Sequence, residues 1–272
     1  MNYSRSPYPG PQDYQGAQGN NQPPSQIPPS APAQPGMVRI NLPLVRPYVT
    51  YAFIGLCVVV YILQLLSQNF LGGDYPAALG AKINEAIMAG QYWRLFTPLL
   101  LHGSILHIGF NMYALYIIGP GLERYYGNLR FFMLYMLGGF AGNVFSFWFS
   151  AADSYGASTA IFGLVVAEAL FIYKNRFLFG NRAGAMIRNV VVIIIINLIL
   201  GLSPGIDNWG HLGGLVGGAA FAWFAGPVFK VVQQFQEYSL VDERTNEDAW
   251  RMTIAVGAAI TVMAAVKIWF KF

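Results

Sequence analysis

A serine and all three histidines of this sequence stand at or just before the starts of apolar stretches. Ser158 begins STAIFGLVVAEAL, and His211 begins HLGGLVGGAAFAWFA. His102 and His107 open a third stretch, which also carries Asn111. A serine hydroxyl becomes a nucleophile when a neighbouring base takes its proton, and histidine suits that task because its pKa lies near neutral pH. The residue types therefore predict a Ser158 nucleophile with His211 as its general base.

His107 and Asn111 are four residues apart, so they share one helical face, and both side chains can donate hydrogen bonds. Acyl transfer requires donors aimed at the developing oxyanion. The backbone N–H of Ser158 is a third candidate, because the first turn of a helix leaves its N–H groups unpaired. We predict an oxyanion hole formed by His107, Asn111 and the Ser158 backbone. The alternatives are interhelical hydrogen bonding by His107 and Asn111 and a helix cap at Ser158.

No carboxylate stands in an obvious position behind the histidine base. Asp207 comes four residues before His211, in an expected loop, and Glu168 lies ten residues, or roughly 15 Å, along the helix from Ser158. We therefore expect a Ser-His dyad and not a triad. For Glu168 we expect a buried polar contact with Asn197, with a proton-relay role as the alternative.

The composition is that of a membrane protein, with 55% hydrophobic and 10% charged residues, against ~45 to 50% and ~25% in soluble domains. The basic residues form no cluster with interleaved aromatics, which argues against a nucleic-acid partner. A helix needs ~17 to 25 residues to cross the bilayer core. Apolar runs of about this length predict seven membrane helices, at about 51–68, 104–120, 131–150, 157–174, 186–202, 211–229 and 252–270.

Lysine and arginine, which accumulate on the cytoplasmic side of membrane proteins, predict the orientation. With the N terminus in the cytoplasm, that side carries twelve of the sixteen basic residues. Ser158 and all the histidines then lie near the outer surface, and the C terminus lies outside. Residues 1–37 hold nine of the sixteen prolines and six glutamines, which predicts a disordered Pro/Gln-rich cytoplasmic tail.

Small residues form a stripe on the helix that begins near His211. At 100° per residue, the histidine shares a face with Gly214, Gly218, Ala222 and Ala225. Such a stripe lets a helix approach the backbone of its neighbour closely. The histidine at its head can therefore come within hydrogen-bonding distance of a serine on an adjacent helix.

Five short motifs occur in a recognisable order along residues 50–229 of the chain. They are WR at Trp93 and Arg94, HxxxxHxxxN at His102, His107 and Asn111, GxxxExxxG at Gly119, Glu123 and Gly127, GxS at Gly156 and Ser158, and HxxGxxxG at His211, Gly214 and Gly218. With these motifs the sequence resembles the rhomboid family of intramembrane serine proteases. The resemblance implies that Ser158 is the nucleophile and His211 the general base. It also implies an oxyanion hole formed by His107, Asn111 and the Ser158 backbone. It further implies that Phe162 stacks on the histidine ring and that His102, Arg94 and Glu123 have structural roles.

Two positions depart from the pattern common in that family. Thr159 follows the nucleophile where many members have glycine. This difference affects the expected rate of the reaction and the shape of the pocket beside Ser158. Gly210 precedes the histidine in place of a frequent alanine, which allows packing at least as close.

The fold predicted is an all-α polytopic membrane protein with a six-helix rhomboid core at 38–230, a cytoplasmic linker at 231–251 and a seventh transmembrane helix at 252–272. The resemblance implies a serine endopeptidase acting on single-span membrane proteins in the lipid bilayer, which cleaves after a small residue and needs no metal or organic cofactor. A catalytically inactive rhomboid-like binding scaffold is the main alternative. A zinc site at the histidines is a weaker alternative, since it leaves Ser158 unexplained. A transporter is also weaker, since no internal repeat is apparent in the sequence. We expect a bacterial plasma membrane, because the chain is compact and shows no transit-type leader.

Overall fold

The computed structural model describes residues 45–234 and 237–270 of the chain. Backbone contacts divide the chain into two units, Met1–Arg39 and Ile40–Phe272, and the described residues belong to the second. The tail predicted over residues 1–37 lies outside the described residues.

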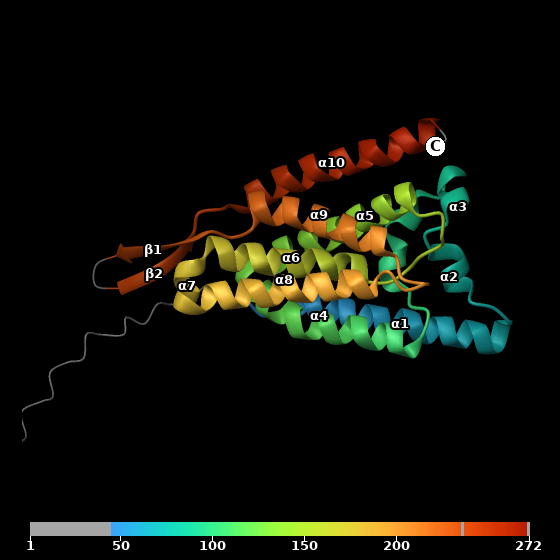
Figure 1. The fold of residues 1–272 in the computed structure, drawn as a ribbon, viewed down its shortest axis with the longest axis horizontal. Helices are drawn as coiled ribbons and strands as arrows, with labels where there is room; N and C mark the ends of the chain where they lie inside the picture. The colour runs from blue at the N-terminus through green and yellow to red at the C-terminus, as the bar shows by residue number, and fades with distance from the viewer. Residues whose placement is uncertain (1–44, 235–236, 271–272) are drawn as a thin grey trace, which may run out of the picture. The chain divides into compact units, whose positions relative to one another are not determined.

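Long helices occupy every stretch where the apolar runs predicted one (Figure 1). Within the described residues they are α1 (Tyr48–Leu71), α4 (Ile105–Tyr126), α5 (Asn128–Phe149), α6 (Ser158–Lys174), α8 (Ala183–Leu200), α9 (Asn208–Ala225) and α10 (Asn246–Phe270). Short helices fill the segment between α1 and α4: α2 (Tyr75–Gly80), α3 (Asn84–Met88), η1 (Tyr92–Leu95) and η2 (Thr97–Leu100). Two more, α7 (Arg176–Phe179) and η3 (Gly180–Arg182), join α6 to α8.

Five described helical segments are long and apolar enough to cross a membrane, namely α1, α4, α5, α10 and the continuous run Arg176–Leu200 that contains α8. The exceptions among the long helices are α6, which has 17 residues, and α9, which is rich in glycine and polar in its first turn. Both pack against α5 and against each other, so much of their surface is covered by protein. The chain is therefore a multi-pass integral membrane protein in which the helices that begin at Ser158 and near His211 are internal.

Glycines bring α5, α6 and α9 into backbone contact. A Cβ added at Gly214 would lie 2.0 Å from the carbonyl oxygen of Thr159, and one at Gly218 would lie 2.4 Å from the Cα of Gly163. On α5, a Cβ at Gly142 would lie 2.5 Å from the Cβ of Thr159. Any larger residue would push the helices apart, so these positions fix how near the start of α6 comes to the start of α9.

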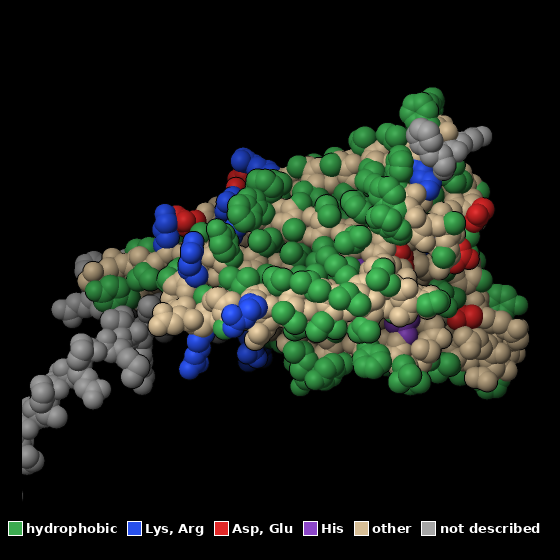
Figure 2. All heavy atoms as spheres, viewed as in Figure 1, with side chains coloured by type: hydrophobic (Ala, Val, Ile, Leu, Met, Phe, Trp, Pro, Cys, Tyr) green, Lys and Arg blue, Asp and Glu red, His purple; other side chains and the backbone are tan. Residues whose placement is uncertain are grey.

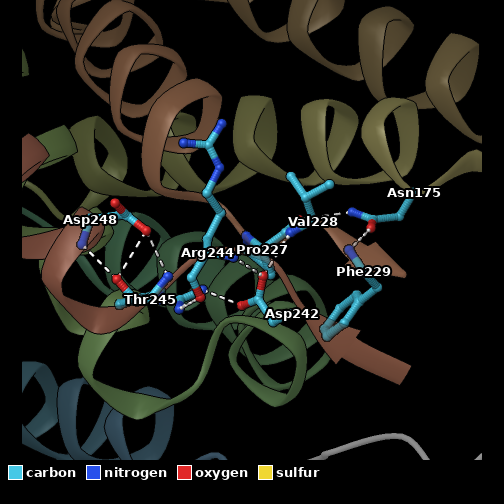
Figure 3. Close-up of polar contacts among 9 residues, drawn as sticks. Asn175, Pro227, Val228, Phe229, Asp242, Arg244, Thr245 and Asp248 are labelled. Carbon is cyan, nitrogen blue, oxygen red and sulfur yellow. Dashed lines mark hydrogen bonds and ion pairs between the residues drawn. The ribbon is translucent and has the colours of Figure 1, made fainter. Parts of the chain in front are cut away.

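The described residues of the segment 231–251, predicted as a linker, include regular secondary structure. It contains most of an antiparallel hairpin of β1 (Phe229–Gln234) and β2 (Glu237–Asp242), and α10 begins at Asn246, six residues earlier than predicted. A lone hairpin is marginally stable in water, and tertiary contacts hold this one (Figure 3). Asn175 accepts a hydrogen bond from the N–H of Phe229 at 2.8 Å and donates to the Pro227 carbonyl at 3.0 Å.

Basic side chains gather at the end of the helices next to the hairpin, as Figure 2 shows in blue. This end holds the end of α4, the α6–α8 connection and the hairpin. The starts of α4, α6 and α9 lie at the opposite end, together with α2 and α3 (Figure 1). The described part of the chain therefore has one basic end, and Ser158 and His211 lie at the other.

Candidate active site

Ser158 and His211 meet through their side chains. Ser158 is the first residue of α6, and His211 lies in the first turn of α9. The distance from Ser158 Oγ to His211 Nε2 is 3.0 Å, within hydrogen-bond reach. The seryl hydroxyl can donate to Nε2 when the ring proton is on Nδ1. The arrangement has the geometry in which an imidazole can remove the proton of a serine nucleophile.

Phe162 packs against the histidine ring from one turn below the serine. The two ring centroids are 4.2 Å apart with an interplanar angle of 13°, which is a stacked arrangement. The side chain of His211 is 7% exposed and that of Phe162 is 8% exposed. This stacking limits rotation of the imidazole and keeps Nε2 directed at Ser158.

Gly156 allows the ring of His107 to approach the serine. Its φ angle is +147°, and a Cβ at this position would lie 2.7 Å from His107 Nε2 and 3.7 Å from Ser158 Oγ. The backbone of Gly156 is held by a hydrogen bond from its N–H to the Pro98 carbonyl at 2.9 Å. A side chain at residue 156 would fill the space in which the imidazole of His107 and the seryl oxygen face each other.

A backbone hydrogen bond just before α4 sets the tautomer of His107. The N–H of Gly103 donates to His107 Nδ1 at 3.3 Å, so the neutral ring carries its proton on Nε2. Ser104 caps the helix by accepting from the His107 N–H at 3.2 Å. The Nε2–H donor therefore lies on the side of the ring next to Gly156. Ser104 is not among the predicted site residues, although a serine directly before an apolar helical run is a known cap signal.

Asn111 lies one turn along α4 from His107 and is 7% exposed. Its Nδ2 donates to the His107 carbonyl at 2.9 Å, which leaves the second amide hydrogen for another acceptor. The N–H of Ser158 has no acceptor within its own helix, because it belongs to the first helical residue. The structure thus places the three predicted oxyanion donors at the starts of two helices, α4 and α6.

No carboxylate among the described residues accepts a hydrogen bond from His211 Nδ1. Asp207 is the N-cap of α9, and its Oδ1 accepts from the Gly210 N–H at 2.9 Å. Within the described residues, Ser158 and His211 therefore form a pair without a carboxylate partner, and their action as a catalytic dyad stays a prediction. The predicted contact between Glu168 and Asn197 is wrong, because Asn197 is exposed and donates to the Ile193 carbonyl of its own helix at 2.8 Å.

Arg94 and His102, to which the resemblance gives structural roles, are buried in the segment before α4. Arg94 donates to the carbonyls of Ala81 at 2.8 Å and Ala78 at 2.7 Å, and so ties η1 to α2. His102 is 1% exposed, and burial lowers its pKa to about 4, so the ring is neutral. Its ring lies edge-on to that of His107, with centroids 5.1 Å apart. These contacts support the site without reaching Ser158.

Glu123 lies at the opposite end of α4 from the dyad, where it caps α1. Its carboxylate accepts from the backbone N–H groups of Val49 at 2.8 Å and Thr50 at 2.7 Å, and from the Thr50 hydroxyl at 2.6 Å. A carboxylate at a helix N-terminus is stabilising because it satisfies unpaired donors and complements the helix dipole. Glu123 therefore stabilises the fold and has no contact with the candidate site.

No group of three or more His, Cys, Asp or Glu residues in the described part of the chain is arranged to hold a metal ion. The three histidines do not form a ligand set, since His211 faces Ser158 while His102 and His107 contact each other by their ring edges.

Comparison with known proteins gives one family. A model of the Rhomboid domain matches residues 89–228. The chain is 42% identical over 174 residues to rhomboid protease GluP of Bacillus subtilis (strain 168), covering 64% of this chain and 34% of that protein. It is 32% identical over 179 residues to RHOMBOID-like protein 9, chloroplastic, of Arabidopsis thaliana, covering 65% and 41% of the two chains. It is 35% identical over 188 residues to RHOMBOID-like protein 1 of the same plant, covering 67% of this chain and 46% of that protein. The match spans less than half the length of each of these relatives.

Proposed function

The chain belongs to the rhomboid family, and from this premise we propose that it is a serine endopeptidase that hydrolyses peptide bonds in or near the transmembrane segments of other membrane proteins. The observation that carries the proposal is the 3.0 Å contact between Ser158 Oγ and His211 Nε2. The relative of the same family that is named a protease supports it. A catalytically inactive binding scaffold has no need for this contact.

The proposed reaction begins when Ser158 Oγ attacks the carbonyl carbon of the scissile bond while His211 Nε2 takes the hydroxyl proton. The imidazolium then gives that proton to the nitrogen of the leaving amine, and the C–N bond breaks to leave an acyl-enzyme. His211 Nε2 then takes a proton from a water molecule, whose oxygen attacks the acyl carbon. Ser158 Oγ leaves and takes this proton back from His211, and the second product is a carboxylic acid.

The oxyanion of each tetrahedral intermediate is stabilised by donors on both sides of the serine. The Ser158 N–H at the start of α6 and the Nε2–H of His107 are two of them, and the second amide hydrogen of Asn111 is the third. All three come from elements whose starts are fixed by capping or by buried contacts. Fixed donors need little reorganisation as charge develops, which is the source of their catalytic effect.

The proposed substrates span the membrane once and present a small residue before the cleaved bond. Ser158 and His107 are partly exposed while Asn111 and His211 are buried, so a substrate can approach the serine from its exposed side. We propose that this approach opens toward the outer face, with the basic end of the protein in the cytoplasm of a bacterial cell, as the positive-inside rule predicts. Water for deacylation enters from the same face.

Covalent labelling by a fluorophosphonate tests the proposal, because this reagent reacts with an activated serine. We expect the purified wild-type protein to gain one label at Ser158, identified by peptide mass. Ser158→Ala should gain none, and His211→Ala should label far more slowly with its fold retained, as judged by thermal unfolding. A folded wild-type protein that takes up no label would favour the scaffold.

A further inference from the structure

Lys82, between α2 and α3, is a fully buried lysine to which the reaction above assigns no role. Lysine is almost never fully buried unless its charge is paired or hydrogen-bonded. Its ammonium donates to the carbonyls of Ala152 at 2.6 Å and Ser150 at 3.3 Å, and to Asn84 Oδ1 at 3.1 Å. The three acceptors match the three hydrogens of an ammonium group.

Both carbonyl acceptors lie in the segment 150–157, which leads from the end of α5 to Ser158. The backbone of Lys82 pairs with the same segment, since its N–H donates to the Ser154 carbonyl at 2.9 Å and its carbonyl accepts from the Ser154 N–H at 3.1 Å. Asn84 adds a bond from Nδ2 to the Ser150 carbonyl at 2.9 Å. The buried ammonium is therefore the centre of the contacts that hold this segment four residues before the serine.

Charged groups from four segments act on the ammonium. Asp207, Asp153 and Glu85 favour its charged form, whereas Lys267 of α10 opposes it. Burial has the largest effect and lowers the pKa of Lys82 below its ordinary value of 10.5. Asp207 is also the N-cap of α9, the helix of His211. The ammonium thus interacts with both segments that precede the dyad residues.

We propose that Lys82 is a positioning residue that fixes the segment 150–157, and through it the placement of the Ser158 hydroxyl against His211. The inference rests on the proposed function, because it concerns the reactivity of the same serine. Lys82 has no contact with Ser158, so it acts only through the backbone that it holds.

Lys82→Met tests the proposal by removing the ammonium while keeping an unbranched side chain that is only one atom shorter. Displacement of a reacting group by about 1 Å can cost ~100-fold in rate. We therefore expect the rate of fluorophosphonate labelling per folded molecule to fall by up to ~100-fold, with kcat lowered and KM nearly unchanged.

Lys267→Met is the matched control. Lys267 is also buried and donates to two carbonyls at the end of α5, those of Phe147 and Trp148, the latter at 3.1 Å. Its acceptors lie before the segment 150–157. This variant should lower the melting temperature and leave the labelling rate of the folded molecules unchanged.

The pH dependence of labelling in the wild-type protein gives a second readout. Because the folded-state pKa of Lys82 lies below that of the unfolded chain, the folded chain binds fewer protons between the two values. The contribution of Lys82 to the free energy of unfolding therefore rises with pH in that interval. Loss of the charge nevertheless weakens the hydrogen bonds from Lys82 to the carbonyls of Ser150 and Ala152. We expect labelling to slow reversibly as the pH rises toward 10.5 while the protein stays folded, and Lys82→Met to lack that decline.

The outcomes separate the inference from its premise. Wild-type labelling with a slow Lys82→Met variant and a normal Lys267→Met variant supports the positioning role. Equal labelling rates per folded molecule in wild type and Lys82→Met, or a wild-type rate that stays constant through the alkaline range, would overturn the role and leave the protease proposal intact. Absence of wild-type labelling would contradict the proposed function, and the inference with it.

Discussion

Asn111 is the residue at which catalysis and packing give the most different expectations. Its side chain is buried at the start of α4, and one amide hydrogen is bonded to the His107 carbonyl at 2.9 Å. That bond lies within a single helix, so it contributes little to the association of helices. The second amide hydrogen is the one that could stabilise an oxyanion. The structure therefore favours an effect of this residue on turnover over an effect on stability.

We predict that Asn111→Ala lowers kcat by up to ~100 to 1,000-fold with little change in KM, since the lost donor acts on charge that develops in the transition state. Donors from His107 and Ser158 reduce the loss. The measurement is kcat and melting temperature from one preparation.

Asn143→Ala serves as the control for Asn111→Ala. Asn143 is also buried, with 2% of its surface exposed, and its amide donates to the Leu95 carbonyl at 2.9 Å and not to a residue of the dyad. This variant should lose stability and keep its turnover per folded molecule. If Asn111→Ala instead shows wild-type kcat with a lowered melting point, the oxyanion assignment is wrong.

Residue types and spacing were enough to select the residues that the structure brings together, because a nucleophile, a base and paired donors are rare at membrane depth. They could not find the roles of Gly103 and Lys82. The bond from the Gly103 N–H to His107 depends on how the chain turns before α4, and the two carbonyl acceptors of Lys82 lie 68 and 70 residues away in the sequence. Contacts of this kind follow from tertiary structure and leave no local pattern.

Helices α6 and α9 depend on glycine for their separation. We predict that Gly214→Ala lowers stability by about 1 to 3 kcal/mol, because the added Cβ would lie 2.0 Å from the Thr159 carbonyl oxygen and must move one helix. The same movement separates Ser158 from His211, so labelling should slow as well. Thermal unfolding and the labelling rate measure the two effects.

Gly257→Ala is the comparison for this substitution. Its Cβ would meet only Leu137 Cδ2, at an ordinary contact distance of 3.7 Å. In a helix interior, alanine is favoured over glycine by roughly 0.5 to 1 kcal/mol, so α10 should accept it. Equal melting temperatures for Gly214→Ala and the wild type would show that the contact between α6 and α9 is looser than the structure has it.

At the scale of elements, apolar runs predicted the ends of the long helices to within six residues, because hydrophobic length is a strong local signal. The hairpin escaped prediction because FKVVQQ and EYSLVD show no strict alternation of polar and apolar residues. Its stability comes from contacts with distant segments. The buried guanidinium of Arg130 on α5 pairs with Asp242 of β2, and Phe229 packs near Phe171 of α6.

At the scale of the whole molecule, the described part of the chain is polarised along the direction of its helices. Basic side chains gather at the hairpin end on the face that Figure 2 shows, and the starts of α4, α6 and α9 lie at the other end (Figure 1). The sequence predicted this separation from the order of its charges alone, because alternate helix ends must lie on the same side. Which side faces the cytoplasm stays a prediction, as does the disorder of residues 1–37.

Cleavage of a single-span membrane protein by the purified protein in lipid vesicles tests the central claim most directly. Mass spectrometry of both fragments gives the position of the cut and whether water was added. We predict one cut, after a small residue, at the end of the substrate span that lies level with Ser158. No cleavage is expected by Ser158→Ala or His211→Ala at equal amounts of folded protein. Undiminished cleavage by either variant, or an intact substrate beside a folded and fluorophosphonate-reactive wild-type protein, would contradict the account.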